Sequence, residues 1–411
     1  MTKEATGSNR LGPRPLGLHL GLASMTVGSA AAALPMALGG ALPWLPELEE
    51  EGAELQKLLQ NLDPAELMLA IGREGQQRLQ GMMSGIQKYQ RHPYKRIQPE
   101  RETTWSRHGA CLLEMPSSSL SSSAPVMFLI PSLVNRSYIL DLKEDRSFFK
   151  ALHQNGIRPV LLDWGEPKGD VADFTLDQYL QQILYPALEY LISRYSKSRV
   201  HVLGYCMGGT IAVPLVDAYQ KQITSFIAVA TPWDFHAELG AVAKMFFSAT
   251  GHWQQVCQTF GNLPVDMLQT LFTALDPNLC MRKFRMFDQL VPESSAAEDF
   301  VALEDWLNDG VPLAREVALQ CLGSWYGRND PVRGEWSVAG KVVCPENITI
   351  PSMIAVPKSD KIVPPSSALA LANVIPDATV VTPPSGHVGM MAGARAPDGL
   401  WRDVITWMEK N

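Results

Sequence analysis

From residue 126 to the C-terminus, short apolar runs alternate with amphipathic segments. Each run is bounded by Gly, Pro or polar residues, which is the pattern of a buried β-strand. Amphipathic stretches such as residues 176–195 separate several of the runs, so we predict an α/β fold with a mostly parallel sheet and helices on both faces. The predicted strands are residues 126–130, 159–162, 199–203, 226–230, 353–356 and 379–381.

Residues 235–345 interrupt this alternation. The stretch is rich in Phe, Trp, Met and Leu at helical spacing and contains no clear strand. An insertion of this length between two strands is typical of a helical cap or lid over the carboxyl edge of a sheet, where active sites form. We therefore predict a cap over about residues 235–345.

The first 104 residues follow a helical pattern. Apolar positions recur at helical spacing between residues 47 and 94, and Asp63-Pro64 followed by Glu66 indicates an N-cap, a first-turn proline and a capping box. The polar, proline-containing stretch RHPYKRIQPER at 91–101 indicates a linker. The predicted organisation is an apolar segment with a helical extension at 1–104, followed by an α/β domain at 105–411.

Residues 15–46 contain no Asp, Glu, Lys or Arg. Such a run near the N-terminus is typical of a signal peptide or a membrane span. Here Ala, Gly and Leu dominate, the run contains His19, and Pro35, Pro43 and Pro46 break it, so it is weakly hydrophobic for a span. We favour a segment that packs on the protein or adheres to an apolar surface, with a signal peptide and a span as alternatives.

Composition narrows the function. The net charge of −7 and the lack of a basic block argue against a nucleic-acid partner. The six cysteines include no C-x-x-C pair, so neither a metal site nor a disulfide framework is predicted, and a reducing cytoplasm fits. Five of them are expected to be small, buried, reduced side chains: Cys111, Cys257, Cys280, Cys321 and Cys344.

Residues 199–210 indicate a strand, a glycine-flanked turn and the start of a helix. The Gly-x-x-x-Gly frame is that of a nucleophile elbow, with Cys206 where most hydrolases carry serine. The turn lifts Cys206 to a helix N-terminus, where the helix dipole favours a thiolate. Gly204, Gly208 and Gly209 leave the room that a Cβ would take. The alternative is a structural cysteine in a glycine-rich turn.

A cysteine nucleophile needs a base and a group that orients the base. In this type of fold the chain order is nucleophile, acid, histidine. His387 follows the last predicted strand in a glycine-containing loop, and Asp360 follows the strand before it. We predict that both converge on Cys206. The competing acids are Asp305, Asp309 and Asp330.

An oxyanion hole requires backbone N–H groups aimed at the developing negative charge. Met207, directly after the nucleophile, is expected to supply one of them. The other is expected from the loop after residues 126–130, where Leu133 and Val134 are the candidates.

Several separated stretches together resemble the polyhydroxyalkanoate (poly-3-hydroxybutyrate) synthase family of α/β-hydrolase-fold enzymes, over about residues 105–410. The resemblance implies an acyltransferase in which Cys206 is the nucleophile and His387 its base. Asp360 then orients His387 or aids deprotonation of the incoming 3-hydroxyl. The stretches are PSLVNRSYILDL (131–142), NGIRPVLLDWGEP (155–167), VHVLGYCMGG (200–209), VATPWDF (229–235), SDKIVP (359–364) and SGHV (385–388).

The same resemblance implies hydroxyacyl-CoA as the substrate with no further cofactor. It also implies a cytoplasmic protein associated with a polyester granule surface, acting as a homodimer or with an accessory subunit. A thiol suits this chemistry because exchange of one thioester for another keeps the acyl group activated for an alcohol acceptor.

The chain departs from that family's pattern around the acid. Lys361 and Pro365 stand where the family usually has histidine and tryptophan, and residues 306–309 match the family's Trp-Asn-x-Asp segment only in part. Two alternatives therefore stay open. One is a cysteine-nucleophile hydrolase or depolymerase of hydroxyalkanoate esters or thioesters, and the other is a non-enzymatic granule-associated protein.

Overall fold

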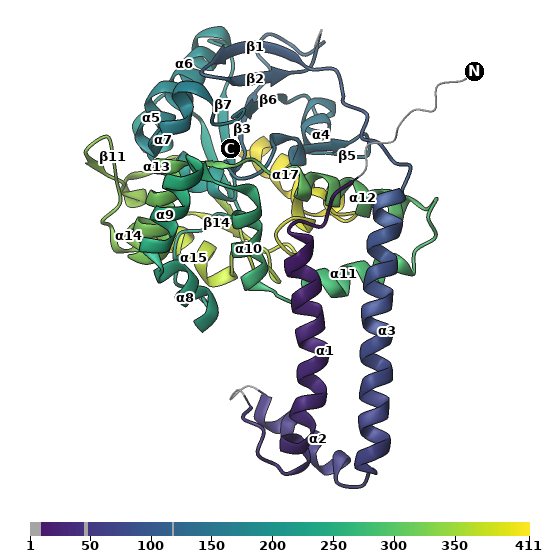
Figure 1. The fold of residues 1–411 in the computed structure, drawn as a ribbon. Coiled ribbons are helices and arrows are strands. Elements are labelled where there is room, and N and C mark those ends of the chain that lie inside the picture. Colours follow the sequence, from purple (N-terminus) through teal and green to yellow (C-terminus); the bar gives the residue numbers. More distant parts are fainter. Residues whose placement is uncertain (1–9, 45–47, 117–118) are drawn as a thin grey trace. The chain divides into compact units, whose positions relative to one another are not determined.

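The computed structural model describes residues 10–44, 48–116 and 119–411 (Figure 1). The chain divides into two compact units, residues 1–94 with 276–308, and residues 95–275 with 309–411. This division differs from the sequence-based one, because residues 276–308 fall in the first unit and not in the cap. The physical reason is that Phe284, Phe287 and Val301 share one buried cluster with Met82 and Tyr89.

The first unit is helical. It contains α1 (Leu16–Leu38), α2 (Glu49–Leu59), α3 (Pro64–Arg91), α11 (Leu279–Asp288) and α12 (Ser295–Asn308). Within this unit α1 and α3 run side by side (Figure 1). The predicted N-cap and first-turn proline of α3 are present, because the Asp63 carboxylate accepts a hydrogen bond from the Ala65 N–H at 2.8 Å and Pro64 lies in the first turn. The predicted capping box does not form, since the Asp63 side chain bonds Ala65 and not Glu66.

The helix α1 covers most of the uncharged N-terminal segment, of which residues 45–46 lie outside the described part of the chain. The predicted break at Pro35 is wrong, because the helix continues through this proline to Leu38. α1 is long and apolar enough to cross a membrane, a test of length and composition that signal sequences and buried core helices also pass. Of its apolar window, 11% is buried. Met25 and Met36 are exposed on it.

The second unit is built on an eight-stranded sheet in the order β1-β2-β6-β3-β7-β8-β13-β14. Pairs from β6 to β14 are parallel, whereas β1–β2 and β2–β6 are antiparallel. All the predicted strands belong to this sheet. The strands are β1 (Glu102–Arg107), β2 (Ala110–Glu114), β3 (Val126–Ile130), β6 (Arg158–Asp163), β7 (Val200–Tyr205), β8 (Ser225–Val229), β13 (Ser352–Ala355) and β14 (Thr379–Val381).

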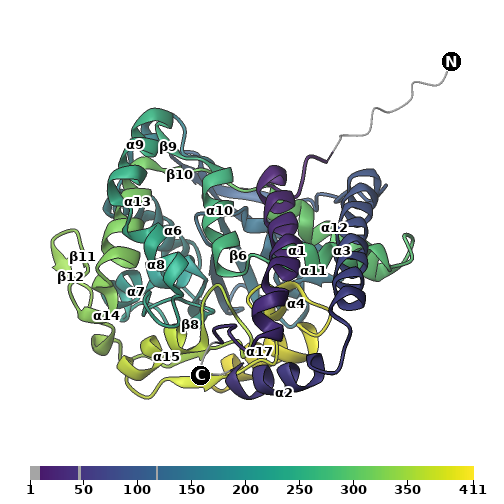
Figure 2. The same ribbon diagram turned by 60° about the horizontal axis from the view of Figure 1, so that its bottom comes forward.

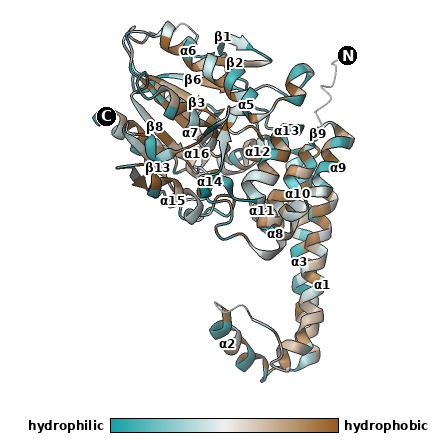
Figure 3. Cartoon of the chain, turned by 90° about the vertical axis from the view of Figure 1, so that its left-hand side faces the viewer, coloured by the Kyte–Doolittle hydropathy of each residue, from teal (hydrophilic) through white to brown (hydrophobic). Residues whose placement is uncertain are grey.

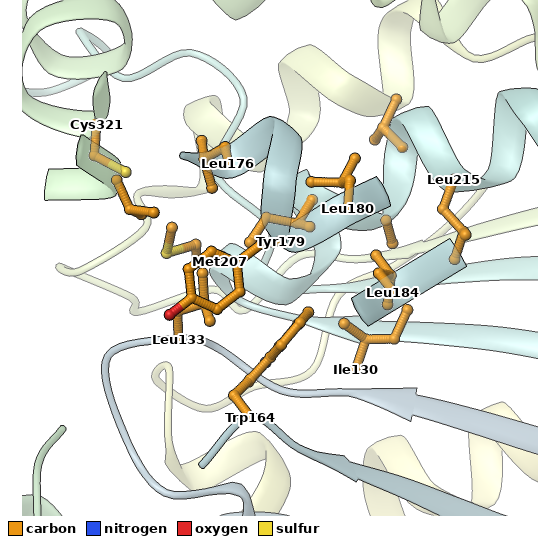
Figure 4. Close-up of a cluster of buried hydrophobic side chains, with 14 of the residues drawn as sticks. Ile130, Leu133, Trp164, Leu176, Tyr179, Leu180, Leu184, Met207, Leu215 and Cys321 are labelled. Atoms are coloured by element: carbon orange, nitrogen blue, oxygen red, sulfur yellow. The ribbon is translucent and has the colours of Figure 1, made fainter. Parts of the chain in front are cut away.

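The core of the second unit lies against the inner strands. Every residue of β3, β7 and β8 is buried. Brown, hydrophobic segments are frequent in the region of the sheet labelled β3 in Figure 3. The predicted helix at 176–195 is present as α5 (Leu176–Tyr179), a π-helical segment η4 (Leu180–Leu184) and α6 (Tyr185–Arg194). Leu180 and Leu184 of η4 belong to one buried cluster with Ile130 of β3, and Leu184 lies beside Ile130 in Figure 4.

Between β8 and β13 the second unit is mainly helical, as the cap prediction expects. Helices α8, α9, α10 and α13 gather there (Figure 2). The expectation of no strand is wrong in detail, because two antiparallel pairs of two-residue strands form, β9–β10 and β11–β12. The elements are α8 (Ala241–Ser248), α9 (Thr250–Phe260), β9 (Asn262–Leu263), α10 (Val265–Leu275), β10 (Leu313–Ala314), α13 (Arg315–Gln320), η5 (Cys321–Gly327), α14 (Asp330–Arg333), β11 (Ser337–Val338) and β12 (Lys341–Val342).

Candidate active site

Cys206 occupies a sharp turn between β7 and α7 (Met207–Tyr219). Its backbone has φ 55° and ψ −129°, a conformation that side-chain-bearing residues rarely adopt. Two hydrogen bonds of 2.9 Å fix the turn, from the Cys206 N–H to the Val229 carbonyl and from the Gly209 N–H to the Cys206 carbonyl. A strained residue held this way at a strand-to-helix turn has the geometry of a nucleophile elbow.

The glycines around Cys206 allow close approach of backbone to backbone. A Cβ on Gly204 would lie 2.7 Å from the Gly209 nitrogen, and a Cβ on Gly208 would lie 2.6 Å from the Pro131 carbonyl oxygen. A Cβ on Gly209 would collide with the Thr231 side chain. None of these three glycines has a positive φ, so close packing is what requires them.

His387 and Asp360 meet at the carboxyl end of the sheet. The His387 Nδ1 and the Asp360 Oδ2 are 2.6 Å apart. The other carboxylate oxygen, Oδ1, accepts hydrogen bonds from the N–H groups of Ile362 at 2.8 Å and Val363 at 3.0 Å. Because both oxygens of this buried carboxylate are engaged, Asp360 is fixed in place and so fixes the imidazole.

The competing acids bind other groups. Asp305 pairs with Arg10 inside the first unit. In the second unit Asp309 lies 3.5 Å from Arg136, and Asp330 accepts from Ser324 at 2.5 Å and pairs with Arg328. Of the four candidate acids, Asp360 is therefore the one that hydrogen-bonds His387.

The Cys206 side chain lies close enough to the His387 imidazole to affect its pKa. Burial of His387 by itself lowers the pKa of the ring, but electrostatic interaction with Cys206 and Asp360 and the hydrogen bond to Asp360 raise this pKa to about 10. The structure thus brings Cys206, His387 and Asp360 together. The raised pKa suits an imidazole that can give a proton to a leaving group and take one back.

Tyr205 supports the histidine and was not found by sequence reasoning. Its buried hydroxyl donates a hydrogen bond to the His387 backbone carbonyl at 3.2 Å, and the two ring centres are 5.3 Å apart. Burial raises the pKa of Tyr205 well above its usual range, so the hydroxyl stays a neutral donor. No pattern in the sequence pairs residue 205 with residue 387.

The loop after β3 lies beside the elbow. The Trp164 indole N–H donates to the Pro131 carbonyl at 2.9 Å, which fixes the start of this loop. Val134 lines the same pocket as Cys206 and Met207, and its N–H makes a long 3.4 Å hydrogen bond to Ser132 Oγ. The Leu133 side chain is buried beside Met207 (Figure 4). The donor roles of these backbone groups stay predictions, although the Met207 N–H is well placed as the first in its helix.

Cys206 opens on a pocket inside the second unit. The pocket holds about 730 Å³ of space not filled by atoms, part of it open to solvent. Leu, Phe and other apolar side chains from α8, α10, η5 and the Asp360 loop form most of its wall. The lining side chains that carry a polar atom besides Cys206 are few: Ser132, Cys321, Trp325 and Tyr326. The Trp325 indole N–H is buried and has no hydrogen-bond partner among the described residues.

The remaining cysteines are all free thiols. Cys257, Cys280 and Cys321 are buried as expected, whereas Cys111 and Cys344 are only half-buried. Cys111 occupies a position of β2 that alternates to its less covered face, and Cys344 lies directly before a short 3-10 helix. Cys321 lines the pocket, and burial raises the pKa of its thiol well above the usual range, so it is not an activated nucleophile. No cluster of His, Cys, Asp or Glu among the described residues is arranged to hold a metal ion.

Comparison with known proteins identifies the fold family of the chain. A family model described as the alpha/beta hydrolase fold matches residues 163–394, which include Cys206, Asp360 and His387. Among solved structures, a carboxyl esterase from Bacillus coagulans has a TM-score of 0.51, with 12% sequence identity, covering 76% of this chain and 98% of the esterase. At that identity the likeness concerns the fold alone.

Similar sequences carry one shared name, poly(3-hydroxyalkanoate) polymerase subunit PhaC. The protein of that name from Haloferax mediterranei is 28% identical over 310 residues, and the one from Haloarcula marismortui is 29% identical over 298 residues. These alignments cover 74% and 72% of this chain, but 63% and 62% of the two relatives. A Synechocystis protein is 28% identical over 70% of this chain and 78% of its own length.

Proposed function

The chain belongs to the alpha/beta hydrolase fold family, and from that premise we propose that it is a polyhydroxyalkanoate synthase-like acyltransferase. It loads hydroxyacyl groups from hydroxyacyl-CoA onto Cys206 and transfers them to the end of a polyester chain. The observation that carries the proposal is a thiol at the elbow that influences the pKa of the Asp360-bound His387 and opens on an apolar pocket. The similarity to polymerase subunits supports it.

In the loading step, the Cys206 thiolate attacks the thioester carbonyl carbon. The negative charge that develops on the carbonyl oxygen is stabilised by the backbone N–H of Met207 and by a second N–H from Leu133 or Val134. The bond between the carbonyl carbon and the CoA sulfur then breaks, and CoA leaves with the proton held by His387. One thioester replaces another, so the acyl group stays activated.

In the transfer step, the hydroxyl of a second hydroxyacyl group attacks the acyl-Cys206 carbonyl. His387 takes the hydroxyl proton, an oxygen ester forms, and the Cys206 sulfur leaves as a thiolate. Asp360 acts here through His387, because both of its carboxylate oxygens already accept hydrogen bonds. This favours orientation of His387 over direct deprotonation of the alcohol by Asp360.

Exclusion of water separates a polymerase from a hydrolase that uses the same residues. Apolar side chains from α8, α10 and η5 surround the space above Cys206, which disfavours water at the acyl group. We propose that the helical segments between β8 and β13 act as a cap that excludes water from the acyl group on Cys206. The hydrolase alternative uses the same Cys206, His387 and Asp360 and has no separate observation in its favour.

We also propose that the protein associates with the polyester surface in the cytoplasm, and the uncharged helix α1 supports this. Its exposed Met25 and Met36 offer apolar contact without a charge to desolvate. Changing both to Glu is expected to lower the fraction of protein that sediments with polymer particles, whereas Gln77→Glu on the exposed face of α3 leaves that fraction unchanged. A homodimer or an accessory subunit remains part of the proposal.

The experiment that tests the proposed reaction uses the purified chain with 3-hydroxybutyryl-CoA and 3-hydroxyoctanoyl-CoA. Free CoA, free hydroxy acid and insoluble polymer are measured together. We expect CoA release to match acyl groups recovered in polymer, and Cys206→Ala to abolish both. Release of free acid without polymer would support the hydrolase and overturn the polymerase.

A further inference from the structure

We propose that Tyr326 determines specificity by recognising the hydroxyl group of the acyl chain loaded on Cys206. This inference rests on the proposed function and names one residue that reads the substrate at that site. Tyr326 lies in η5, on the wall of the pocket onto which Cys206 opens.

The phenol of Tyr326 is close to the nucleophile. Burial, and then electrostatic interaction with Cys206 and Cys321, raise the pKa of Tyr326 above its usual range, so its hydroxyl is a neutral group at physiological pH. A neutral phenol both donates and accepts a hydrogen bond. It therefore matches an alcohol, which does the same.

The ring of Tyr326 is held in a fixed orientation by its neighbours. It is stacked on Phe247 with ring centres 4.0 Å apart and an interplanar angle of 12°, and it meets Phe235 edge-on with centres 5.0 Å apart. Its backbone carbonyl accepts a 2.8 Å hydrogen bond from His236. Among the described residues, none forms a hydrogen bond with the Tyr326 hydroxyl. The hydroxyl is thus positioned in advance and available to a ligand.

The rest of the wall offers little to a substrate hydroxyl. Most lining side chains are apolar, so an alcohol entering the pocket loses its hydration and needs a partner. Cys321 carries a weakly hydrogen-bonding thiol, and the Ser132 oxygen already accepts from the Val134 N–H at 3.4 Å. A pocket that pairs a substrate hydroxyl discriminates against the analogue that lacks it.

The test measures the rate at which Cys206 is acylated in a single turnover, with enzyme in excess over substrate. The substrates are pairs of acyl-CoA that differ only in the 3-hydroxyl group. The probes are 3-hydroxyoctanoyl-CoA against octanoyl-CoA, and 3-hydroxybutyryl-CoA against butanoyl-CoA. CoA release gives the rate, and intact-protein mass gives the acylated fraction. For Tyr326→Phe we expect the ratio of hydroxylated to plain loading rates to fall about tenfold, while loading by the plain acyl-CoA is retained.

The plain acyl-CoA serves as an internal control for folding, because a misfolded variant would lose both reactions. Tyr219→Phe, which removes a hydroxyl bonded to Glu189 on the exposed part of α7, should leave the ratio at the wild-type value. An unchanged ratio in Tyr326→Phe would overturn the proposal, as would a fall seen in Ser132→Ala instead. Failure of the wild type to load any acyl-CoA would refute the proposed function itself, a distinguishable result.

Discussion

The Tyr205 hydroxyl donates a hydrogen bond to the backbone carbonyl of His387. The residue directly before Cys206 therefore supports the loop that carries the imidazole, so the strand that positions the nucleophile also positions the base. This link joins residues 182 positions apart in the chain.

Tyr205→Phe removes this hydrogen bond and leaves the ring in place. We expect the free energy of unfolding to fall by about 1–2 kcal/mol, because a buried carbonyl loses its partner. The loading rate should fall several-fold as the His387 loop loosens, with the apparent KM for acyl-CoA little changed. Denaturant unfolding and single-turnover CoA release measure the two effects. A loading rate equal to wild type would show that the link is only structural.

Asp360→Asn keeps the shape of the side chain but removes its charge. If Asp360 orients His387, both loading and transfer should slow, on the order of 100-fold or more, because the imidazole loses its fixed tautomer and its stabilising charge. If Asp360 instead deprotonates the incoming alcohol, loading stays fast and only transfer stops. Measuring CoA release and polymer separately distinguishes these results, and retained fast loading would contradict the orienting role.

The pKa of His387 depends on Cys206 and Asp360. In Cys206→Ala the electrostatic interaction with the sulfur is lost, so this pKa should fall from about 10 toward lower values, with Asp360 still holding it up. It is measured by NMR titration of the histidine ring. A pKa that does not change in Cys206→Ala would show that the sulfur carries no charge that reaches the ring.

The same pKa has a consequence for stability. Because the folded-state pKa of His387 lies above its ordinary value of 6.5, its contribution to stability is fully present below pH 6.5 and is lost as pH rises toward about 10. Cys206→Ala should weaken this loss. Unfolding by denaturant at pH 6 and pH 9.5 in both proteins measures the difference, and an equal loss in the two would contradict the coupling.

Gly208 allows the elbow to approach the loop after β3. Gly208→Ala places a Cβ 2.6 Å from the Pro131 carbonyl oxygen, so we expect a loss of about 1–3 kcal/mol in unfolding free energy and a larger loss of loading. Gly251→Ala in the exposed part of α9 is the matched control, since its Cβ meets nothing within 4 Å. There, a neutral or slightly stabilising effect is expected. Equal behaviour of the two variants would refute the close-packing argument.

The parts of the fold that local sequence signals specify were predicted correctly. The inner strands appear as continuous apolar runs because both faces are buried, and Asp360 follows one of them, β13. His387 follows the mostly exposed edge strand β14, which its β-branched residues Thr379, Val380 and Val381 mark in the sequence. The antiparallel strand β1 was missed because its residues are mostly polar and exposed, so no apolar run marks it. Its pairing with β2 is what stabilises it as a strand.

Contacts between residues far apart in the chain could not be predicted from the sequence. The membership of residues 276–308 in the first unit depends on a cluster that includes Met82 and Phe284, far apart in the chain. The Tyr205–His387 bond and the exposure of Tyr326 to the pocket also arise only when distant elements meet. The motif around Cys206 identifies the nucleophile from the sequence. The residues that position His387 and line the pocket are found only in the structure.

The measurement that tests the central claim most directly is identification of the acyl-enzyme. The purified chain is mixed with 3-hydroxyacyl-CoA and quenched in acid within the first turnover, and the modified peptide is located by mass spectrometry. The account predicts one hydroxyacyl group on Cys206, and none on Cys321 or in Cys206→Ala. Acylation of another residue, or turnover of 3-hydroxyacyl-CoA by Cys206→Ala, would contradict it.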